Sequence, residues 1–312
     1  MEDLDSLLRR QHGLVSRDQL RGLGVSARAI TARASRGWRL VLPHVVAVGL
    51  FAPPTQHQRR VAALLEAGDV GVLTGHHACA VHGLTSAQQQ GPVEVLVPRN
   101  QASRTVAFVR IRRTARMPRS VVRGGLPVAE RARAVVDAAR SSRALNDVRA
   151  VVIEAVQRNL VPVERLEREL VAGPRRGSRL VRLALDDARQ GAWSAPEAEL
   201  LRLCGTSSVL PGLLMNPQLW AGSRRLVTPD GWFDDVGMAV MVHSRAHHLR
   251  EADWQGTVER DNELTAHGIV VVAVTPASIR RSPQKVLATI EQAYLAARDR
   301  PRPAVRVVPR RS

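Results

Sequence analysis

Residues 16–49 read SRDQLRGLGVSARAITARASRGWRLVLPHVVAVG, and this stretch carries the strongest fold signal in the chain. Ser16, followed three residues later by Gln19, is a capping box that predicts the start of a helix. The glycines at positions 22 and 24 end that helix and supply the turn of a helix-turn-helix. Ser26 is placed to cap the next helix. The stretch therefore predicts two consecutive helices separated by a loose turn.

Elements on both sides complete this unit. Before it, residues 4–13 predict a short helix with a leucine stripe. After it, two apolar segments, Trp38–Leu42 and Val45–Val48, flank a Pro-His dipeptide as strands flank a hairpin turn. We therefore expect a winged helix-turn-helix over residues 1–50, with the hairpin as its wing.

The exposed faces of the third helix and the wing carry the candidate DNA-binding residues. Arginine pairs with phosphates and with the O6 and N7 edge of guanine. A solvated helix face on an arginine-rich chain, or a winged helix that binds only protein, would show the same pattern. DNA binding is favoured because the caps, the turn and the wing all occur in order. The candidates are Arg28, Thr31, Arg33, Arg36 and Arg39.

The net charge indicates the same partner, double-stranded DNA. The 46 basic and 28 acidic residues give a formal charge of +18 and a pI of about 11.6. Nucleic acid is the default partner of so basic a chain. However, Lys285 is the only lysine, and codon bias in a GC-rich genome also inflates arginine. The charge alone therefore does not establish DNA binding.

Length and composition limit the other classes of protein. A chain of 312 residues is expected to form two or three domains. Its two cysteines, Cys79 and Cys204, are too few for a disulfide framework or a cysteine-built zinc site. No apolar run approaches the roughly 20 residues that cross a bilayer, and the N-terminus lacks the pattern of a signal peptide. We therefore expect a cytoplasmic protein of α/β class, with several domains and no membrane partner.

The N-terminal part resembles a known family, the AbiEi-type antitoxins of abortive-infection systems. The resemblance covers about residues 7–140 and implies an autoregulating DNA-binding antitoxin or related regulator, with a cognate toxin protein as partner. The helix residue after Arg133 is alanine, where the family usually has threonine. The segments that carry the resemblance are RQHGLVSRDQL (10–20), VSARAI (25–30), TGHHACAVHGL (74–84) and Arg133 with Asp137.

The middle region, residues 51–190, predicts an AbiEi-like α/β part followed by helices. Helices are expected at Gln56–Ala67 and Gly75–Val81, and strands at Val93–Val97 and Val106–Ile111. Residues 129–190 have a helical pattern almost throughout, interrupted by a basic Gly/Pro loop at 173–177.

Several polar residues of this region have a simple structural interpretation. Taken without the resemblance, Arg133 and Asp137 are an i,i+4 ion pair on a helix. His76 and His77 are a helix start and a core residue rather than metal ligands, because the sequence around them lacks acidic residues.

Residues 191–299 predict a separate α/β domain, and residues 300–312 a disordered basic tail. Ser194 with Pro196 marks the start of the first helix. The continuous apolar run Ile269–Val274 is typical of a buried central strand. The other expected elements are strands at Arg225–Thr228 and Met238–Val242 and helices at Trp254–His267 and Ser282–Arg298.

A carboxylate before one strand of this domain and polar residues after the next form a candidate catalytic site. Metal-dependent nucleases collect Mg²⁺ ligands in this way, because Mg²⁺ prefers carboxylate oxygens and activates the attacking water. The segment, in which Asp230 precedes a strand that ends at His243, resembles PD-(D/E)XK endonuclease-fold proteins. That family's pattern expects an acid where this chain has Met241, and an acid or lysine at the His243 position. By that standard the site is degenerate.

The same segment also resembles the very-short-patch-repair mismatch endonucleases, which share this fold. Their arrangement of Pro-Asp, a strand ending in histidine and a further histidine matches Asp230, His243 and His248. The resemblance implies that Asp230 and the Val242 carbonyl hold Mg²⁺, and that the two histidines act as general base and charge stabiliser. It also implies that Glu197 supports the site as an outer acid.

This resemblance, over about residues 194–296, is incomplete. The zinc ligands of the repair enzymes have no counterpart, and Trp232 and Trp254 are as well explained as core residues as by a mismatch wedge. Val-Glu-Arg-Asp at 258–261 resembles the following helix of both groups. The favoured function is a DNA-binding regulator or antitoxin with a non-cleaving nuclease-fold module and no cofactor. The alternative is a Mg²⁺-dependent DNA endonuclease that uses the acids and histidines named above.

Overall fold

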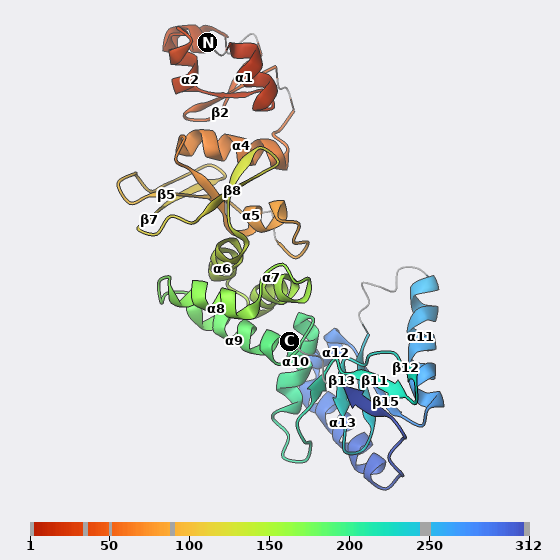
Figure 1. Cartoon of the computed structure of the whole chain (residues 1–312). Helices are drawn as coiled ribbons and strands as arrows, with labels where there is room; N and C mark the ends of the chain where they lie inside the picture. Colours follow the sequence, from red (N-terminus) through yellow and green to blue (C-terminus); the bar gives the residue numbers. More distant parts are fainter. Residues whose placement is uncertain (1–2, 34–36, 50–51, 88–90, 244–250, 309–312) are drawn as a thin grey trace. The chain divides into compact units, whose positions relative to one another are not determined.

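The computed structural model describes residues 3–33, 37–49, 52–87, 91–243 and 251–308. The chain divides into two compact units, residues 1–181 and 182–312, and each contains helices and sheets (Figure 1). The protein is therefore of mixed α/β class with more than one folded unit, as the sequence indicates. The boundary between the units falls within helix α9 (Ser178–Arg189).

The chain begins with three short helices and three short strands. The helices and the hairpin follow the sequence-based prediction closely. Strand β1 is absent from that prediction; it pairs antiparallel with β3, so that the sheet order is β1-β3-β2. The elements are α1 (Leu4–Arg10), β1 (Leu14–Ser16), α2 (Arg17–Gly22), α3 (Ala27–Arg33), β2 (Trp38–Leu42) and β3 (Val45–Val48).

One small core holds these elements together. Leu7 of α1, Leu20 of α2 and Ile30 of α3 pack against Val15 and Val46 of the sheet. All five side chains are buried. Ile30 is the only residue of α3 in this core, so the other faces of that helix are left for solvent or a partner.

The capping box at the start of α2 forms as predicted. The Gln19 N–H donates to Ser16 Oγ at 3.1 Å, and the Ser16 N–H donates to Gln19 Oε1 at 2.9 Å. We expect Ser16→Ala to lower the free energy of unfolding of this unit by about 1 kcal/mol, because one helix N–H loses its acceptor. Urea unfolding followed by circular dichroism measures the change. Ser16→Asp keeps an acceptor and should retain most of the stability; an equal loss in both variants would exclude the cap as the cause.

A six-stranded mixed sheet forms the centre of the first unit, in the order β6-β7-β5-β4-β9-β8. Helix α4 contacts both this sheet and the N-terminal one (Figure 1). The predicted strand Val106–Ile111 is wrong as a single element: Ala107 has a φ of 47°, and a tight turn divides the run into β6 and β7. The bounds are α4 (Gln56–Ala67), β4 (Val72–Thr74), α5 (Gly75–Val81), β5 (Val93–Pro98), β6 (Arg104–Val106), β7 (Val109–Thr114), β8 (Ser120–Arg123) and β9 (Leu126–Ala129).

Helices occupy most of the chain from 131 to 189, as predicted. They are α6 (Arg131–Ser141), α7 (Leu145–Gln157), α8 (Val163–Val171) and α9, and no helix covers the predicted Gly/Pro break at 173–177. The ion pair predicted on α6 is present, with Arg133 Nε 2.8 Å from Asp137 Oδ2. Thr74 Oγ1 donates to the same oxygen at 2.7 Å. The buried pair therefore ties α6 to the end of β4, which is a structural role.

The second unit contains a four-stranded sheet in the order β10-β13-β14-β15 and a three-stranded sheet in the order β12-β11-β16. Trp232 and Phe233 are neighbours on β13 and are fully buried in two different core clusters, because successive side chains of a strand point to opposite faces. The bounds are α10 (Ala195–Cys204), β10 (Leu214–Met215), β11 (Gln218–Ala221), β12 (Arg224–Arg225), β13 (Gly231–Phe233), β14 (Met238–Val242), α11 (Glu251–Ala266), β15 (Val270–Val274), α12 (Pro276–Arg281), α13 (Pro283–Arg298) and β16 (Arg306–Val308).

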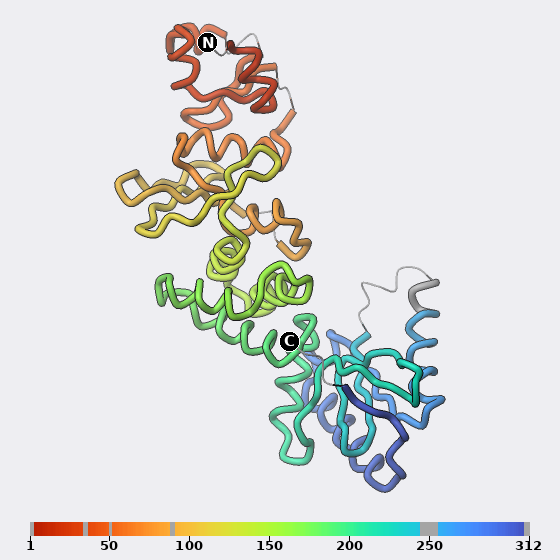
Figure 2. Tube along the Cα trace, viewed as in Figure 1, coloured from red at the N-terminus to blue at the C-terminus, as the bar shows by residue number. Residues whose placement is uncertain are grey.

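Three expectations for this unit need correction. The apolar run at 269–274 forms β15 at the edge of its sheet, not at the centre; α11 and α13 both contact this strand, which explains its apolar sequence. Of the strand expected at Arg225–Thr228, only Arg225 lies in a strand, because β12 consists of Arg224 and Arg225. The tail beginning at residue 300 is not wholly disordered, because β16 pairs with β11 and lies beside it (Figure 2).

No helix in the described part of the chain is both long and apolar enough to cross a bilayer.

Candidate functional site

Helix α3 presents the first group of candidate residues. Arg28, Thr31 and Arg33 are all exposed, whereas Ile30 is buried in the core behind them. The helix contains no acidic residue. In the described part of the chain, Arg28 has no hydrogen-bond or ion-pair partner, so its guanidinium group is available to a ligand.

Contacts at the hairpin beside α3 orient the side chains of two candidate residues, Arg33 and Arg39. The guanidinium carbon of Arg33 lies 5.0 Å from the centre of the Trp38 ring on β2, a cation–π distance. Arg39 on the same strand donates from Nη2 to the Ala52 carbonyl at 2.9 Å and remains exposed. Arg36 lies outside the described residues. The structure therefore places four of the five predicted residues on α3 and β2, which are adjacent in the chain.

The surrounding sequence makes this region strongly positive. From position 19 to position 65 the chain has seven arginines and no acidic residue. We refer to Arg28, Thr31, Arg33 and Arg39 as the arginine face.

The second group of candidates surrounds the start of β13 in the second unit. Asp230 Oδ2 accepts a hydrogen bond of 2.6 Å from the Val242 N–H at the end of β14. The Asp230 carbonyl accepts a 3.2 Å bond from the Asn216 N–H. The aspartate therefore joins the loop after β10 to the far end of β14.

Glu197 of α10 is held by three donors. Its Oε2 accepts from the Trp193 N–H at 2.8 Å and from Asn216 Nδ2 at 2.7 Å, and its Oε1 accepts from Ser194 Oγ at 2.8 Å. Asn216 is a site residue that the sequence did not reveal. Its Asn-Pro dipeptide and its φ of 49° are signals of a turn, not of a site.

Burial changes the acidity of these two carboxyl groups. It raises the pKa of Asp230 to about 7, and the nearby charge of Glu197 adds to the rise; the Val242 N–H and Arg260 oppose it. Burial also raises the pKa of Glu197, against its hydrogen bonds from Asn216, Trp193 and Ser194. The site therefore contains a carboxyl group that is partly protonated near neutral pH.

His243 is paired with an acid from the following helix. Its Nε2 lies 2.8 Å from Asp261 Oδ2 on α11, and its backbone N–H donates to the Val274 carbonyl on β15. Asp261 lies in the Val-Glu-Arg-Asp segment, but no role was predicted for it from the sequence. His248 lies outside the described residues, so its predicted role is not addressed by the structure.

The described residues around Asp230 fit a magnesium ion poorly. Mg²⁺ takes oxygen ligands in near-octahedral geometry, usually from one or two carboxylates with water and phosphate. Here both oxygens of Glu197 already accept hydrogen bonds, and Met241 stands where the nuclease pattern has an acid. Of the two carboxylates, only Asp230 Oδ1 accepts no hydrogen bond from a described residue. The part of the chain that the structure describes has no cluster of three or more metal-ligating side chains.

Together, the fold and these groups define a multi-unit α/β protein with an arginine face and a buried acidic cluster. No known protein family matches the sequence, and no curated protein matches it either. Among solved structures, the chain is similar to the Rv2827c protein from Mycobacterium tuberculosis, with 18% identity and a TM-score of 0.42. The similarity covers 66% of this chain and 81% of that one.

Proposed function

We propose that this protein is a DNA-binding transcriptional regulator of the AbiEi antitoxin type, and that residues 1–50 are its winged helix-turn-helix. The observation that carries the proposal is the arginine face. Helix α3 exposes Arg28, Thr31 and Arg33 with Ile30 anchored behind them, and the adjacent hairpin adds Arg39. A recognition helix followed by a basic wing has this arrangement.

The mechanism follows from the geometry of the face. Helix α3 enters the major groove, where Arg28 reaches a guanine edge or a phosphate. The Thr31 hydroxyl donates to the Ala27 carbonyl at 3.1 Å and exchanges this bond for one to a phosphate when DNA binds. The Trp38 ring holds Arg33 in a defined direction, which lowers the entropy lost when Arg33 contacts phosphate. The hairpin then contacts the neighbouring backbone through Arg39. Phosphate contacts set the register, and Arg28 has the best position to read sequence.

Fluorescence anisotropy with a labelled duplex from upstream of the protein's own coding sequence tests this proposal. We expect saturable binding that is stronger than binding to a shuffled duplex of equal length. Because each neutralised phosphate contributes about 0.9 to the slope of log affinity against log salt, three to four arginine contacts predict a slope of roughly −3. Binding that is absent, or insensitive to salt, would contradict the proposal.

We further propose that the second unit is an endonuclease-like fold that binds DNA or a partner without cleaving DNA. The engaged oxygens of Glu197, the methionine at position 241 and the pairing of His243 with Asp261 support this. A cognate toxin is the partner that the antitoxin assignment implies. Co-purification with the product of an adjacent toxin-like gene would support that part of the proposal.

The Mg²⁺-dependent endonuclease remains the second candidate, because Asp230 Oδ1 is open and lies beside a second acid. Incubation of supercoiled plasmid with the protein and Mg²⁺ or Mn²⁺ separates the two functions. We expect no nicking above that of a mock purification. Nicking that disappears in both Asp230→Ala and His243→Ala would instead establish the enzyme, whereas nicking that persists in both would indicate a contaminating nuclease.

A further inference from the structure

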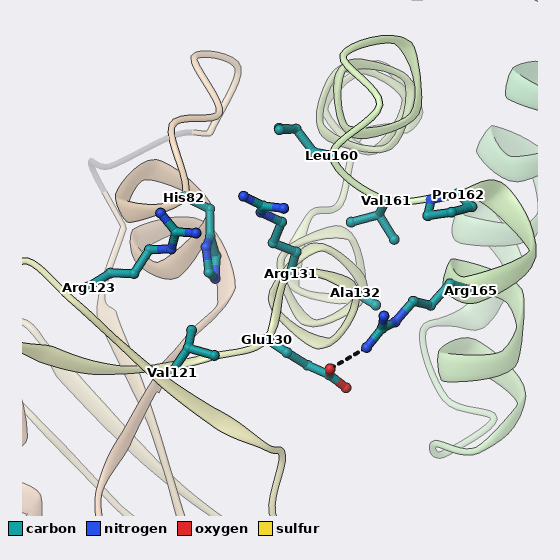
Figure 3. Close-up of a pocket in the computed structure, with 10 residues that line it drawn as sticks. All are labelled: His82, Val121, Arg123, Glu130, Arg131, Ala132, Leu160, Val161, Pro162 and Arg165. Atoms are coloured by element: carbon teal, nitrogen blue, oxygen red, sulfur yellow. Dashed lines mark hydrogen bonds and ion pairs between the residues drawn. The ribbon is translucent and has the colours of Figure 1, made fainter.

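A hollow of about 210 Å³ lies in the first unit of the chain. It is formed by the β8–β9 hairpin, the end of α5, the start of α6 and the segment between α7 and α8 (Figure 3). Neither the DNA-binding proposal nor the acidic cluster uses any of its residues.

The walls of the hollow carry an excess of positive charge. Three arginines and one glutamate line it. The glutamate, Glu130, forms an ion pair with Arg165, whose Nη2 lies 2.5 Å from Glu130 Oε2. Arg123 and Arg131 have no acidic partner among the described residues. The Nε of Arg131 is also buried without a hydrogen-bond partner. Such groups are costly to leave unsatisfied, so the hollow favours an anion.

A buried histidine adds an unsatisfied acceptor. Nε2 of His82 lies 2.8 Å from the Ala129 carbonyl, which can only accept, so this nitrogen carries the hydrogen. Nδ1 of the neutral ring is then an acceptor, and it is buried with no partner in the described structure. Figure 3 shows Arg123 and Arg131 on either side of this ring. Burial lowers the pKa of His82, and the charges of the two arginines lower it further.

The helix that begins at the hollow adds to the positive potential. Arg131 is the first residue of α6, an eleven-residue helix whose N-cap, Glu130, makes no side-chain capping bond. The uncapped N–H groups and the helix dipole favour an anion at this end. The remaining walls are apolar and include Val121, Leu160 and Val161.

We propose that this hollow binds a small organic oxyanion, in which a phosphate or carboxylate group is carried on a compact apolar body. The oxyanion lies between the guanidinium groups of Arg123 and Arg131, and the apolar body contacts Leu160 and Val161. His82 forms part of the wall between the two arginines, and its fully buried Nδ1 does not contact the ligand. A volume of about 210 Å³ lies below the roughly 300–1,000 Å³ of typical ligand pockets, so the hollow suits a compact ligand such as a single ring.

Isothermal titration calorimetry with phenyl phosphate, benzoate, inorganic phosphate and phenol tests the proposal on the full chain. Phenyl phosphate or benzoate is expected to bind, and whichever binds more tightly identifies phosphate or carboxylate as the group. Arg123→Ala and Arg131→Gln should each weaken that binding by about tenfold or more, because each removes a charged hydrogen bond. Arg99→Ala, at an exposed turn after β5, is the matched control and should change it less than about twofold.

Three outcomes would overturn the proposal: phenol binding as tightly as either charged ring, inorganic phosphate binding as tightly as phenyl phosphate, or Arg99→Ala weakening binding as much as Arg123→Ala. Circular dichroism of each variant guards against misfolding. Arg123 is exposed, so its replacement should leave the fold intact even if Arg131→Gln does not. Absence of binding by both charged rings to the folded wild-type chain would also reject the site.

Discussion

Replacing Arg28 and Arg33 together by alanine is expected to weaken the binding of duplex DNA by about a hundredfold at 0.15 M salt. Each arginine contact with a phosphate or a guanine edge contributes roughly 1.4 kcal/mol or more, which is about a factor of ten in affinity. If both arginines contact phosphate, the salt dependence should also become shallower by roughly two units of slope. Anisotropy titrations at four salt concentrations measure both quantities.

A matched control variant has the same net charge as Arg28→Ala/Arg33→Ala. Arg99→Ala/Arg113→Ala removes two charges as well, one from the exposed turn after β5 and one from an exposed position of β7. This variant should bind DNA within about threefold of the wild type, because charges outside the contact face act only through the screened long-range field. If both double variants lose affinity equally, the protein binds DNA by its overall charge and α3 is not the recognition helix.

The two single variants distinguish direct contact from support of the wing. Arg28 has no described partner, so Arg28→Ala should weaken binding without a change in thermal unfolding. Arg33 lies over Trp38, so Arg33→Ala also removes a cation–π contact worth about 0.5–1 kcal/mol at an exposed site. A small loss of stability is therefore expected in Arg33→Ala alone.

Elements defined by local signals could be predicted from the sequence. Ser16 and Gln19 satisfy each other within one turn of helix, and Ser194 with Pro196 begins α10 in the same way. Such starts depend on residues three or four positions apart, so they are visible in the sequence. The hairpin of β2 and β3 is equally local, and it also formed as expected.

Elements that depend on distant partners were missed or misplaced. Strand β1 exists because β3, some thirty residues later, pairs with it, and β16 exists because β11 does. The apolar sequence of β15 predicts a central strand with both faces covered, but β15 is an edge strand on which Val272 and Val274 are buried and Ala273 is exposed. A continuous apolar run therefore shows neither how a strand is paired at its edges nor whether both its faces are buried.

The same distinction applies to the acidic cluster. Asp230 was predicted because it lies at the start of a strand, and Glu197 because the resemblance to the repair endonucleases implies an outer acid there. Asn216 joins them only because β10 pairs with β13, and Asp261 reaches His243 only because α11 lies against the end of β14. Neither residue type is unusual in its local sequence. Long-range pairing, not local pattern, determines the membership of this cluster.

The largest stability effect is expected at Asp230. Its pKa in the folded protein is raised to about 7, above the ordinary value of about 3.9, so the folded state holds the proton more tightly than the unfolded state. Stability should therefore be complete below about pH 4, fall as the pH rises towards 7 and stay low above it. Asp230→Asn cannot ionise and still accepts from the Val242 N–H. This variant should be more stable than wild type at pH 8, by about 2–4 kcal/mol, and equal to it at pH 4.

Tryptophan fluorescence during urea unfolding measures this effect, because four of the five tryptophans lie after residue 181. Asp234→Asn is the control with the opposite sign. Burial tends to raise the pKa of Asp234, but hydrogen bonds from Trp232 and Arg302 outweigh it and lower that pKa, so the carboxylate stabilises the fold at neutral pH. Asp234→Asn should therefore lose stability at pH 8. A gain for Asp230→Asn would mean that the buried carboxylate is kept at a cost to folding, as expected for a residue that serves binding or catalysis rather than the fold. A loss at both pH values would mean that Asp230 serves the fold through its bond to Val242.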